Sequence, residues 1–424
     1  MELVSLLKRL TVCLFIFGTV TVILNAYILD HLYYSYPASH ALEPKATYKG
    51  ARMLTLNMFM RPPGIHSHSS DYKNQRLRYL IDEVLPHYDI ITLQEMFAFM
   101  STRRRRLIRA AEEQGFHYWI TSPPKSLWDL SIDGGLLILS RYPIVEMDSV
   151  QYPRGEYSDW LASKGALFAK IALNPASHMY LFTTHTQASY GRVTPLEAPS
   201  VKIRFNQFSI LHEFIASKTS QRLPGEPVVL QGDLNVDARL HSPGHEEDLY
   251  ESRSSEEYLR MLEILRGTSF ASPAPNPVIV SKGSVPLSPL TPSINLGSTV
   301  DRHQPIHRVA FRDLVYHQYR YHPVTFADLE VLDDGQRVPR DQVLTDNSLH
   351  GSCQRLDFVF WADGEDYPSY SAYAEPTSRF AIQPVNTTVM PFFVEQKDIP
   401  APFTQLSDHY GVSTEVMVVK MNNT

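Results

Sequence analysis

Short apolar runs that lead into polar residues recur along the chain. Runs of about four to eight residues rich in β-branched and aromatic side chains are typical of buried β-strands. The runs and their polar residues are residues 51–56 with Asn57, 89–93 with Glu95, 179–184 with His185, 226–231 with Asp233 and Asn235, and 354–360 with Asp357. Because these polar residues share one chemical character, we predict that the strands end in one region and build a site there.

The remaining pattern predicts helices and one long loop. Residues 256–265 have the apolar spacing of a helix, and residues 103–109 predict another helix with a solvated arginine face suited to anionic lipid headgroups. Residues 272–293 contain six prolines, which break both helices and central strands. This loop belongs to an insertion at about residues 240–345, for which a substrate lid and a disordered excursion both stay open.

The amino-terminal region contains an apolar stretch, residues 10–29, that is long enough to cross a bilayer as one helix. Lys8 and Arg9 precede it, and the positive-inside bias therefore places residues 1–9 in the cytoplasm. We expect a signal anchor, a stalk at residues 30–50, and a catalytic domain that is luminal or extracellular. Secretion after cleavage of a signal peptide is the alternative.

Composition agrees with a folded enzyme and disfavours one class of partner. Of the 424 residues, 43% are hydrophobic and 11% aromatic, enough for a sizeable core. The formal net charge of −6 argues against a nucleic-acid partner, which would need a basic face. Two glycosylation acceptor patterns, at Asn386 and Asn422, agree with a luminal or extracellular domain.

Two short motifs carry the strongest chemical signal. Gly232-Asp233-Leu234-Asn235 and Ser407-Asp408-His409 each join a carboxylate to a neutral hydrogen-bonding or proton-accepting side chain. Hard cations that act on phosphate esters require such a mixture. Alone, an Asp-x-Asn sequence is often a turn and an Asp-His pair is often on the surface. The preceding strands favour the functional interpretation.

The order of motifs along residues 51–418 resembles the endonuclease/exonuclease/phosphatase superfamily. The motifs that carry this resemblance are Asn57, Leu93-Gln94-Glu95, Gly134-Gly135-Leu136 with Ser140-Arg141-Tyr142-Pro143, Thr184-His185, Gly232-Asp233-Leu234-Asn235, Arg355-Leu356-Asp357 and Ser407-Asp408-His409. Within the superfamily, residues 159–168 are similar to neutral sphingomyelinases, in which an Asp and a Lys five residues later form a switch near the active site. That switch falls here on Asp159 and Lys164. Residues 419–424 form a tail beyond the similarity.

The resemblance implies an α/β fold, a four-layered sandwich of the deoxyribonuclease I-like type with two packed mixed sheets flanked by helices. We expect Glu95 to bind Mg²⁺, or Mn²⁺ as an alternative, because Mg²⁺ takes few protein oxygens and keeps several waters. Asp408 and Asn57 would complete that metal site. The expected catalytic residues are Asn57, His185, Asp233, Asn235, Asp357 and His409, with His409 as general base and Asp357 as its partner. That pairing requires the strand at residues 354–360 to neighbour the carboxyl-terminal strand.

Simpler interpretations of three positions stay open. Asp357 could pair with Arg355, His185 could be a core histidine, and Asp159 with Lys164 could be solvated charges on a loop. The expected function is a membrane-anchored, Mg²⁺-dependent phosphodiesterase that cleaves sphingomyelin, or a related phospholipid, to ceramide and phosphocholine. A nuclease or other phosphoesterase of the superfamily is the first alternative, and a non-enzymatic, membrane-tethered binding module is the second.

Overall fold

The computed structural model describes residues 18, 49–67, 71–124, 131–175, 177–189, 191, 194–223, 225–242, 248–269, 308–363, 380–394 and 403–420. The predicted anchor at residues 10–29 lies outside this part of the chain apart from Gly18, and so do most of the stalk, the proline-rich stretch and Asn422. No helix within the described residues combines the length and apolar character needed to cross a membrane.

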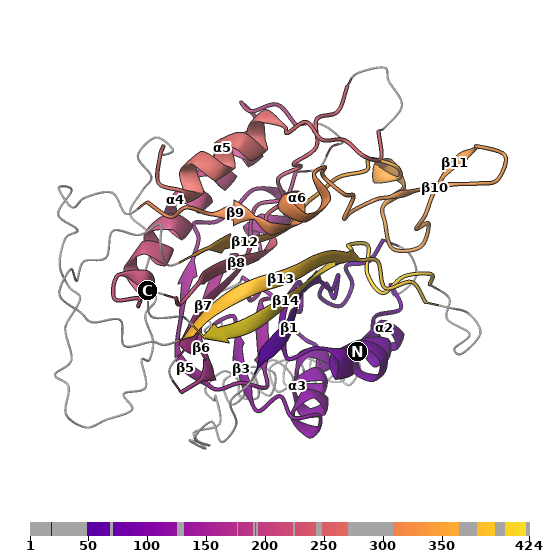
Figure 1. Ribbon diagram of the computed structural model, residues 1–424. Coiled ribbons are helices and arrows are strands. Elements are labelled where there is room, and N and C mark those ends of the chain that lie inside the picture. Colours follow the sequence, from indigo (N-terminus) through magenta and orange to yellow (C-terminus); the bar gives the residue numbers. More distant parts are fainter. Residues whose placement is uncertain are drawn as a thin grey trace, which may run out of the picture.

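Two six-stranded sheets pack face to face at the centre of the protein (Figure 1). The first sheet has the order β13-β14-β1-β2-β4-β3 and the second β5-β6-β7-β8-β12-β9. The first comprises β1 (Gly50–Asn57), β2 (Ile90–Gln94), β3 (Tyr118–Thr121), β4 (Leu137–Ser140), β13 (Phe380–Met390) and β14 (Gly411–Lys420). The second comprises β5 (Ile144–Gln151), β6 (Gly165–Asn174), β7 (Ser177–His185), β8 (Val228–Asp233), β9 (Arg312–Asp313) and β12 (Asp357–Ala362). Both sheets mix parallel and antiparallel pairs.

Helices cover the outer faces of both sheets, which confirms the predicted four layers (Figure 1). The α-helices are α2 (Lys73–Tyr79), α3 (Arg103–Glu113), α4 (Pro199–Thr219), α5 (Glu256–Leu265) and α6 (Leu314–Tyr319). The shorter elements are η1 (Leu80–Val84), η2 (Leu85–His87), η3 (Tyr157–Trp160), η4 (Asn347–Leu349) and the hairpin β10 (Leu329–Val331) with β11 (Arg337–Pro339). The bounds of α5 are those predicted from its apolar spacing.

Three hydrophobic clusters fill the spaces between the four layers. One lies between α2, α3 and the first sheet, one between the two sheets, and one between the second sheet and helices α4 and α5. Strand β8 shows why its sequence is continuously apolar. Val228 and Leu230 pack toward the helices, whereas Val229 packs between the sheets, so both faces of the strand are buried.

Parallel pairing brings the polar strand ends to one edge of the sandwich. Asn57 of β1 is level with Gln94 of β2, and His185 of β7 is level with Asp233 of β8. The strand predicted at residues 354–360 instead begins at Asp357, so this residue starts the strand and does not end it. Because β12 runs antiparallel to β8, Asp357 still lies opposite Asp233 at the same edge.

Two further predictions can be compared with the structure. Strands β12 and β14 contact each other across the sandwich, so they are neighbours as expected, although they belong to different sheets and do not pair edge to edge. The arginine run does lie in α3, but Arg104 is buried, and its Nη1 lies 3.0 Å from Asp133 Oδ1. The prediction of a wholly solvated arginine face is therefore wrong, because helix α3 turns Arg104 toward the protein.

Candidate active site

Asn57 joins the two sheets at the centre of the candidate site. Its Nδ2 donates to Asp233 Oδ2 at 2.9 Å and to Glu95 Oε1 at 3.2 Å. Its Oδ1 accepts from the backbone N–H of Phe59 at 3.0 Å, which fixes the orientation of the amide. The last residue of β1 therefore holds a carboxylate from each sheet.

Glu95 presents an oxygen that no group of the described residues satisfies. Its Oε2 is buried and has no hydrogen-bond partner among the described residues, and its backbone has the left-handed φ of 54°. Burial, together with the charge of Glu95, raises the pKa of Asp408 to about 7. Uncompensated negative charge at a buried carboxylate pair is the environment that a divalent cation stabilises. Glu95, Asn57 and Asp408 therefore fit the metal site predicted for them.

A second group of side chains could also hold a cation. Asp233, Asp357 and His409 bring one ligand atom each within 4.8 Å of one another, and all three are buried. However, His409 Nδ1 already lies 2.9 Å from Asp357 Oδ2. Coordination through Nδ1 would break this hydrogen bond, and coordination through Nε2, 3.9 Å from Asp233 Oδ2, would occupy the ring nitrogen that is left to accept a proton. We therefore favour the Glu95 oxygen as the metal ligand.

His409 and Asp357 form a buried dyad. Besides the bond to Asp357, His409 Nε2 lies 3.9 Å from Asp233 Oδ2, and the ring of Phe326 packs 4.8 Å from the imidazole. Burial opposes the charged imidazolium, but Asp357 and Asp233 outweigh it and hold the pKa of His409 well above its usual range. The dyad can therefore accept a proton and stabilise the resulting charge.

Three residues from different segments form a chain beside Asp233. Lys164 Nζ lies 2.8 Å from Asp159 Oδ2 and 3.2 Å from His185 Nε2, and it donates to the carbonyl of Thr186 at 2.6 Å. His185 Nε2 also lies 3.4 Å from Asp233 Oδ2. Burial and the Lys164 ammonium hold the pKa of His185 well below its usual range, so this imidazole is neutral. Asp159 and Lys164 are thus a buried pair next to the site, and not solvated loop charges.

Asn235 follows Asp233 on a tight turn. Its backbone N–H donates to Asp233 Oδ1 at 2.9 Å, its Nδ2 donates to the Thr186 carbonyl at 3.0 Å, and its φ is 51°. Burial and the charge of Asp357 raise the pKa of Asp233. A cavity of about 270 Å³ opens beside Asn235 and is lined in part by Arg204, Asp237 and His241.

The structure also shows why Asp357 does not pair with Arg355. The Nη2 of Arg355 donates to both oxygens of Asp313, at 2.7 and 2.8 Å, and its Nη1 lies 2.8 Å from His322 Nδ1. This leaves Asp357 to His409. His322 and Asp313 were not singled out from the sequence, because nothing in their spacing distinguishes them from other scattered histidines and carboxylates.

Arg76 is a further residue that sequence reasoning missed. It is fully buried on α2 and donates to the carbonyls of Met58, Phe59 and Leu406. It thereby ties the segment after Asn57 to the segment before Asp408. A lone arginine in a short helix gives no sequence signal for this role. Among the predicted modification sites, Asn386 is half-buried on β13.

Comparisons with known proteins identify the family and the fold. The profile of the Endonuclease/Exonuclease/phosphatase family matches residues 54–409. A sphingomyelinase of Dictyostelium discoideum is 32% identical over 421 residues, covering 89% of this chain and 82% of the relative. Sphingomyelinase C of Listeria ivanovii is 29% identical over 164 residues, covering 36% of this chain and 47% of the relative.

Solved structures show the same fold. The crystal structure of a beta toxin from Staphylococcus aureus covers 86% of this chain and 99% of its own with a TM-score of 0.51 and 18% identity. Sphingomyelinase C from Streptomyces griseocarneus covers the same fractions with a TM-score of 0.50 and 19% identity.

Proposed function

Because the chain belongs to the Endonuclease/Exonuclease/phosphatase family and is a sphingomyelinase-like hydrolase of the phosphodiesterase type, we propose that it cleaves sphingomyelin to ceramide and phosphocholine. The observation that carries this proposal is the buried His409–Asp357 dyad, placed beside Asp233 and Asn57 and next to the unpartnered oxygen of Glu95. The sphingomyelinase of Dictyostelium discoideum supports the substrate, since it matches across most of both chains.

His409 acts as the general base in this proposal. Its Nε2 removes a proton from a water molecule, whose oxygen then bonds to phosphorus while the bond from phosphorus to the ceramide oxygen breaks. Asp357 stabilises the imidazolium through the 2.9 Å hydrogen bond. The ceramide oxygen takes up a proton as it leaves, so one water is consumed and phosphocholine and ceramide are the products.

Neutral donors surround the position where charge develops on the phosphate. His185 is neutral, and its buried Nδ1 has no partner within the described part of the chain, which suits a hydrogen bond to a phosphate oxygen. Asn57 and Asn235 hold Asp233 in place and add amide groups at the same edge. Lys164 positions His185 through its Nε2, and Asp159 holds Lys164.

Glu95, Asn57 and Asp408 would hold one Mg²⁺, or Mn²⁺ in its place. Such a cation supplies positive charge that stabilises the phosphate oxygens as the diester reacts. The raised pKa of Asp408 and the unpartnered Glu95 oxygen support this assignment. No metal ligand in this assignment comes from helix α3 or from the cavity beside Asn235.

The chain's organisation around residues 51–418 is part of the same proposal. Residues 10–29 form a signal anchor, residues 1–9 are cytoplasmic, and residues 30–50 are a stalk that keeps the catalytic domain close to lipid. An anchor of this kind raises the effective concentration of a membrane substrate at the site. Digestion of sealed membrane vesicles with protease tests the topology, because the catalytic domain should be protected when it is luminal.

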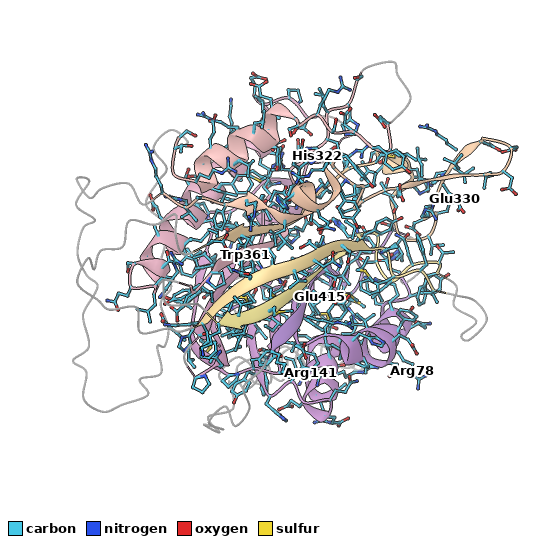
Figure 2. The ribbon with its side chains drawn as sticks, viewed as in Figure 1. Arg78, Arg141, His322, Glu330, Trp361 and Glu415 are labelled. Carbon is cyan, nitrogen blue, oxygen red and sulfur yellow. The ribbon has the colours of Figure 1, made fainter. Side chains whose placement is uncertain are left out.

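Release of phosphocholine from sphingomyelin vesicles tests the reaction. The full chain should hydrolyse sphingomyelin in Mg²⁺ and stop when a chelator is added. Glu95→Gln should lose activity, whereas Glu330→Gln, which changes an exposed carboxylate on the β10–β11 hairpin (Figure 2), should not. Inert vesicles with rapid cleavage of DNA or RNA would instead favour the nuclease alternative.

A further inference from the structure

The turn that carries Asp159 exposes an unusual amount of apolar surface. In the 3₁₀ turn η3 and the residue after it, Tyr157 is 76% exposed, Trp160 52% and Leu161 44%. Asp159, in the same turn, is only 8% exposed and holds Lys164. One short segment thus faces solvent with aromatic side chains on one side and the candidate active site on the other.

The backbone of this turn is strained. Tyr157 has a φ of 53°, which bulky residues adopt only rarely. Gln187 packs closely against the residues that precede this turn. Its Oε1 accepts from the Glu156 N–H at 2.9 Å, and a Cβ added at Gly155 would lie 2.0 Å from the same oxygen. The protein therefore keeps an exposed tyrosine in an unfavourable backbone conformation at this turn.

A second exposed apolar pair is connected to this turn. Phe99 is 46% and Met100 52% exposed in the loop that follows Glu95. Both segments bind residues 131–135, because Ala98 N–H donates to Asp133 Oδ2 at 2.9 Å and Ile132 N–H donates to the Leu161 carbonyl at 2.8 Å. We refer to the exposed residues Phe99, Met100, Tyr157, Trp160 and Leu161 as the apolar rim.

The charge beside the apolar rim is suited to a phosphate-rich surface. Exposed Arg154 stacks its guanidinium 4.8 Å from the Trp160 ring and donates to the Trp160 carbonyl at 2.8 Å. The β10–β11 hairpin differs, because its exposed Val331 and Leu332 are accompanied by three exposed carboxylates, Glu330, Asp333 and Asp334. Figure 2 shows Glu330 on this projecting hairpin.

We propose that the apolar rim docks the protein onto the interfacial region of a lipid bilayer. Tyr and Trp rings with one polar end prefer this region, and arginine interacts there with lipid phosphates. The inference rests on the proposed function, because docking would serve hydrolysis of a membrane lipid. Membrane binding itself can be measured without hydrolysis. Docking would hold the site against the bilayer and transmit contact with lipid to Lys164 and His185 through Asp159.

Quenching of tryptophan fluorescence tests docking independently of catalysis. The tryptophan fluorescence of the full chain bound to phosphatidylcholine vesicles should be quenched when the lipids carry bromine on acyl-chain carbons close to the headgroup. The test compares Trp128→Phe with the double variant Trp128→Phe and Trp160→Phe, so that Trp160 is the one tryptophan that differs. The quenched component should disappear in the double variant, while the buried Trp119 and Trp361 emit equally in both proteins. Equal quenching of the two proteins would overturn the proposal, even for a chain that does not hydrolyse sphingomyelin.

A comparison of two substrates tests the consequence for turnover. Tyr157→Ser with Trp160→Ser should reduce hydrolysis of vesicle sphingomyelin by roughly 10-fold or more, since the apolar burial of two rings is lost. Hydrolysis of a soluble diester such as bis(4-nitrophenyl) phosphate should not change. The matched double variant Tyr250→Ser with Leu259→Ser removes exposed apolar side chains elsewhere and should hydrolyse both substrates normally. Equal losses on both substrates, or none on vesicles, would contradict a docking role.

Discussion

Two buried histidines in this protein have pKa values shifted in opposite directions because the charges beside them differ. His409 lies 2.9 Å from Asp357, and the surrounding carboxylates raise its pKa well above the usual range despite burial. His322 is also buried, but burial and the guanidinium of Arg355 lower its pKa to about 3. Burial alone therefore does not make a histidine catalytic; the charge placed against it decides.

The carboxylates beside these histidines differ in the same way. Both oxygens of Asp313 accept from Arg355, which completes a buried ion pair. Asp357 uses one oxygen for His409 and leaves Oδ1 without a partner among the described residues, as Glu95 leaves Oε2. Buried polar atoms are nearly always paired unless function requires otherwise. The His322 region also keeps buried nitrogens without a partner among the described residues, the Nε atoms of Arg355 and Arg239, but its carboxylate is fully paired. We infer from the unpaired carboxylate oxygens that the His409 region is built for chemistry, and from the complete Arg355–Asp313 pair that the His322 region is built for stability.

The largest expected effect separates the two histidines by activity. His409→Ala should lower kcat by roughly 10³-fold, within the range for loss of a general base. His322→Gln should keep kcat within roughly 3-fold, because its imidazole does not face the proposed reaction. Steady-state phosphocholine release at matched concentrations of folded protein measures both. Similar losses in the two variants would remove the distinction.

The second expected effect separates the regions by stability. Arg355→Met should lower the free energy of unfolding by about 3–5 kcal/mol, because it leaves Asp313 buried without its partner. Denaturant titration followed by circular dichroism measures this loss. Arg78→Met, at a side chain that is 80% exposed (Figure 2), is the matched control and should unfold like the wild type. A wild-type midpoint for Arg355→Met would show that the pair is not structural.

Mg²⁺ should stabilise the folded protein by binding in the region around His409 and not in the region around His322. At a Mg²⁺ concentration of 100 times Kd, the folded state should gain about 2.7 kcal/mol, and a chelator should remove it. Differential scanning fluorimetry with and without Mg²⁺ reports the shift in Tm. Glu95→Gln should abolish this shift, whereas Arg355→Met should retain it from a lower starting Tm. A shift that survives in Glu95→Gln would assign the cation to Asp233, Asp357 and His409 instead.

Acid should weaken the fold through His322. Its folded-state pKa of about 3 lies below the value of about 6.5 expected in the unfolded chain, so the unfolded state binds the proton first. This contribution to stability is complete above about pH 6.5 and is lost as the pH falls toward 3. Denaturant titrations between pH 7 and 4 should show a shallower decline in His322→Gln. An equal slope in both proteins would contradict the assigned charge state.

The smallest effect concerns the pH dependence of activity. The base must be neutral, and Asp357 helps to raise its pKa, so activity should increase with pH as His409 loses its proton. Asp357→Asn removes a negative charge, which lowers the pKa of His409 and moves the acid limb of the kcat profile to lower pH. The maximal rate should also fall, because the imidazolium is less stabilised. If the acid limb of the kcat profile stays at the same pH in Asp357→Asn, a group other than His409 controls it.

Much of the candidate site could be predicted from local sequence. The apolar run of β8 predicts a strand buried on both faces, and its end at Asp233 places a carboxylate at the sheet edge. The spacing of residues 256–265 likewise predicts α5. These features depend on neighbours along the chain, whose periodicity of apolar side chains is visible in the sequence.

Contacts between distant segments could not be predicted in this way. The bond between Asp357 and His409 was expected from the family resemblance and not from local periodicity, and it joins segments of two sheets that pack against each other. The contact between Lys164 and His185 joins the residue before β6 to the last residue of β7. The carbonyl contacts of Arg76 join segments more than 300 residues apart.

The apolar periodicity of the sequence was enough to predict which strands are buried and which polar residues lie at or near their ends. The tertiary structure was needed to show that Asp313 takes Arg355 and leaves Asp357 to His409. It also showed that the neighbouring carboxylates raise the pKa of His409 against the effect of burial, whereas burial and Arg355 lower the pKa of His322. The physical reason is that hydrophobic periodicity is a local property of the chain. Charge state and pairing depend on atoms within a few ångströms, which come from segments that are distant in sequence.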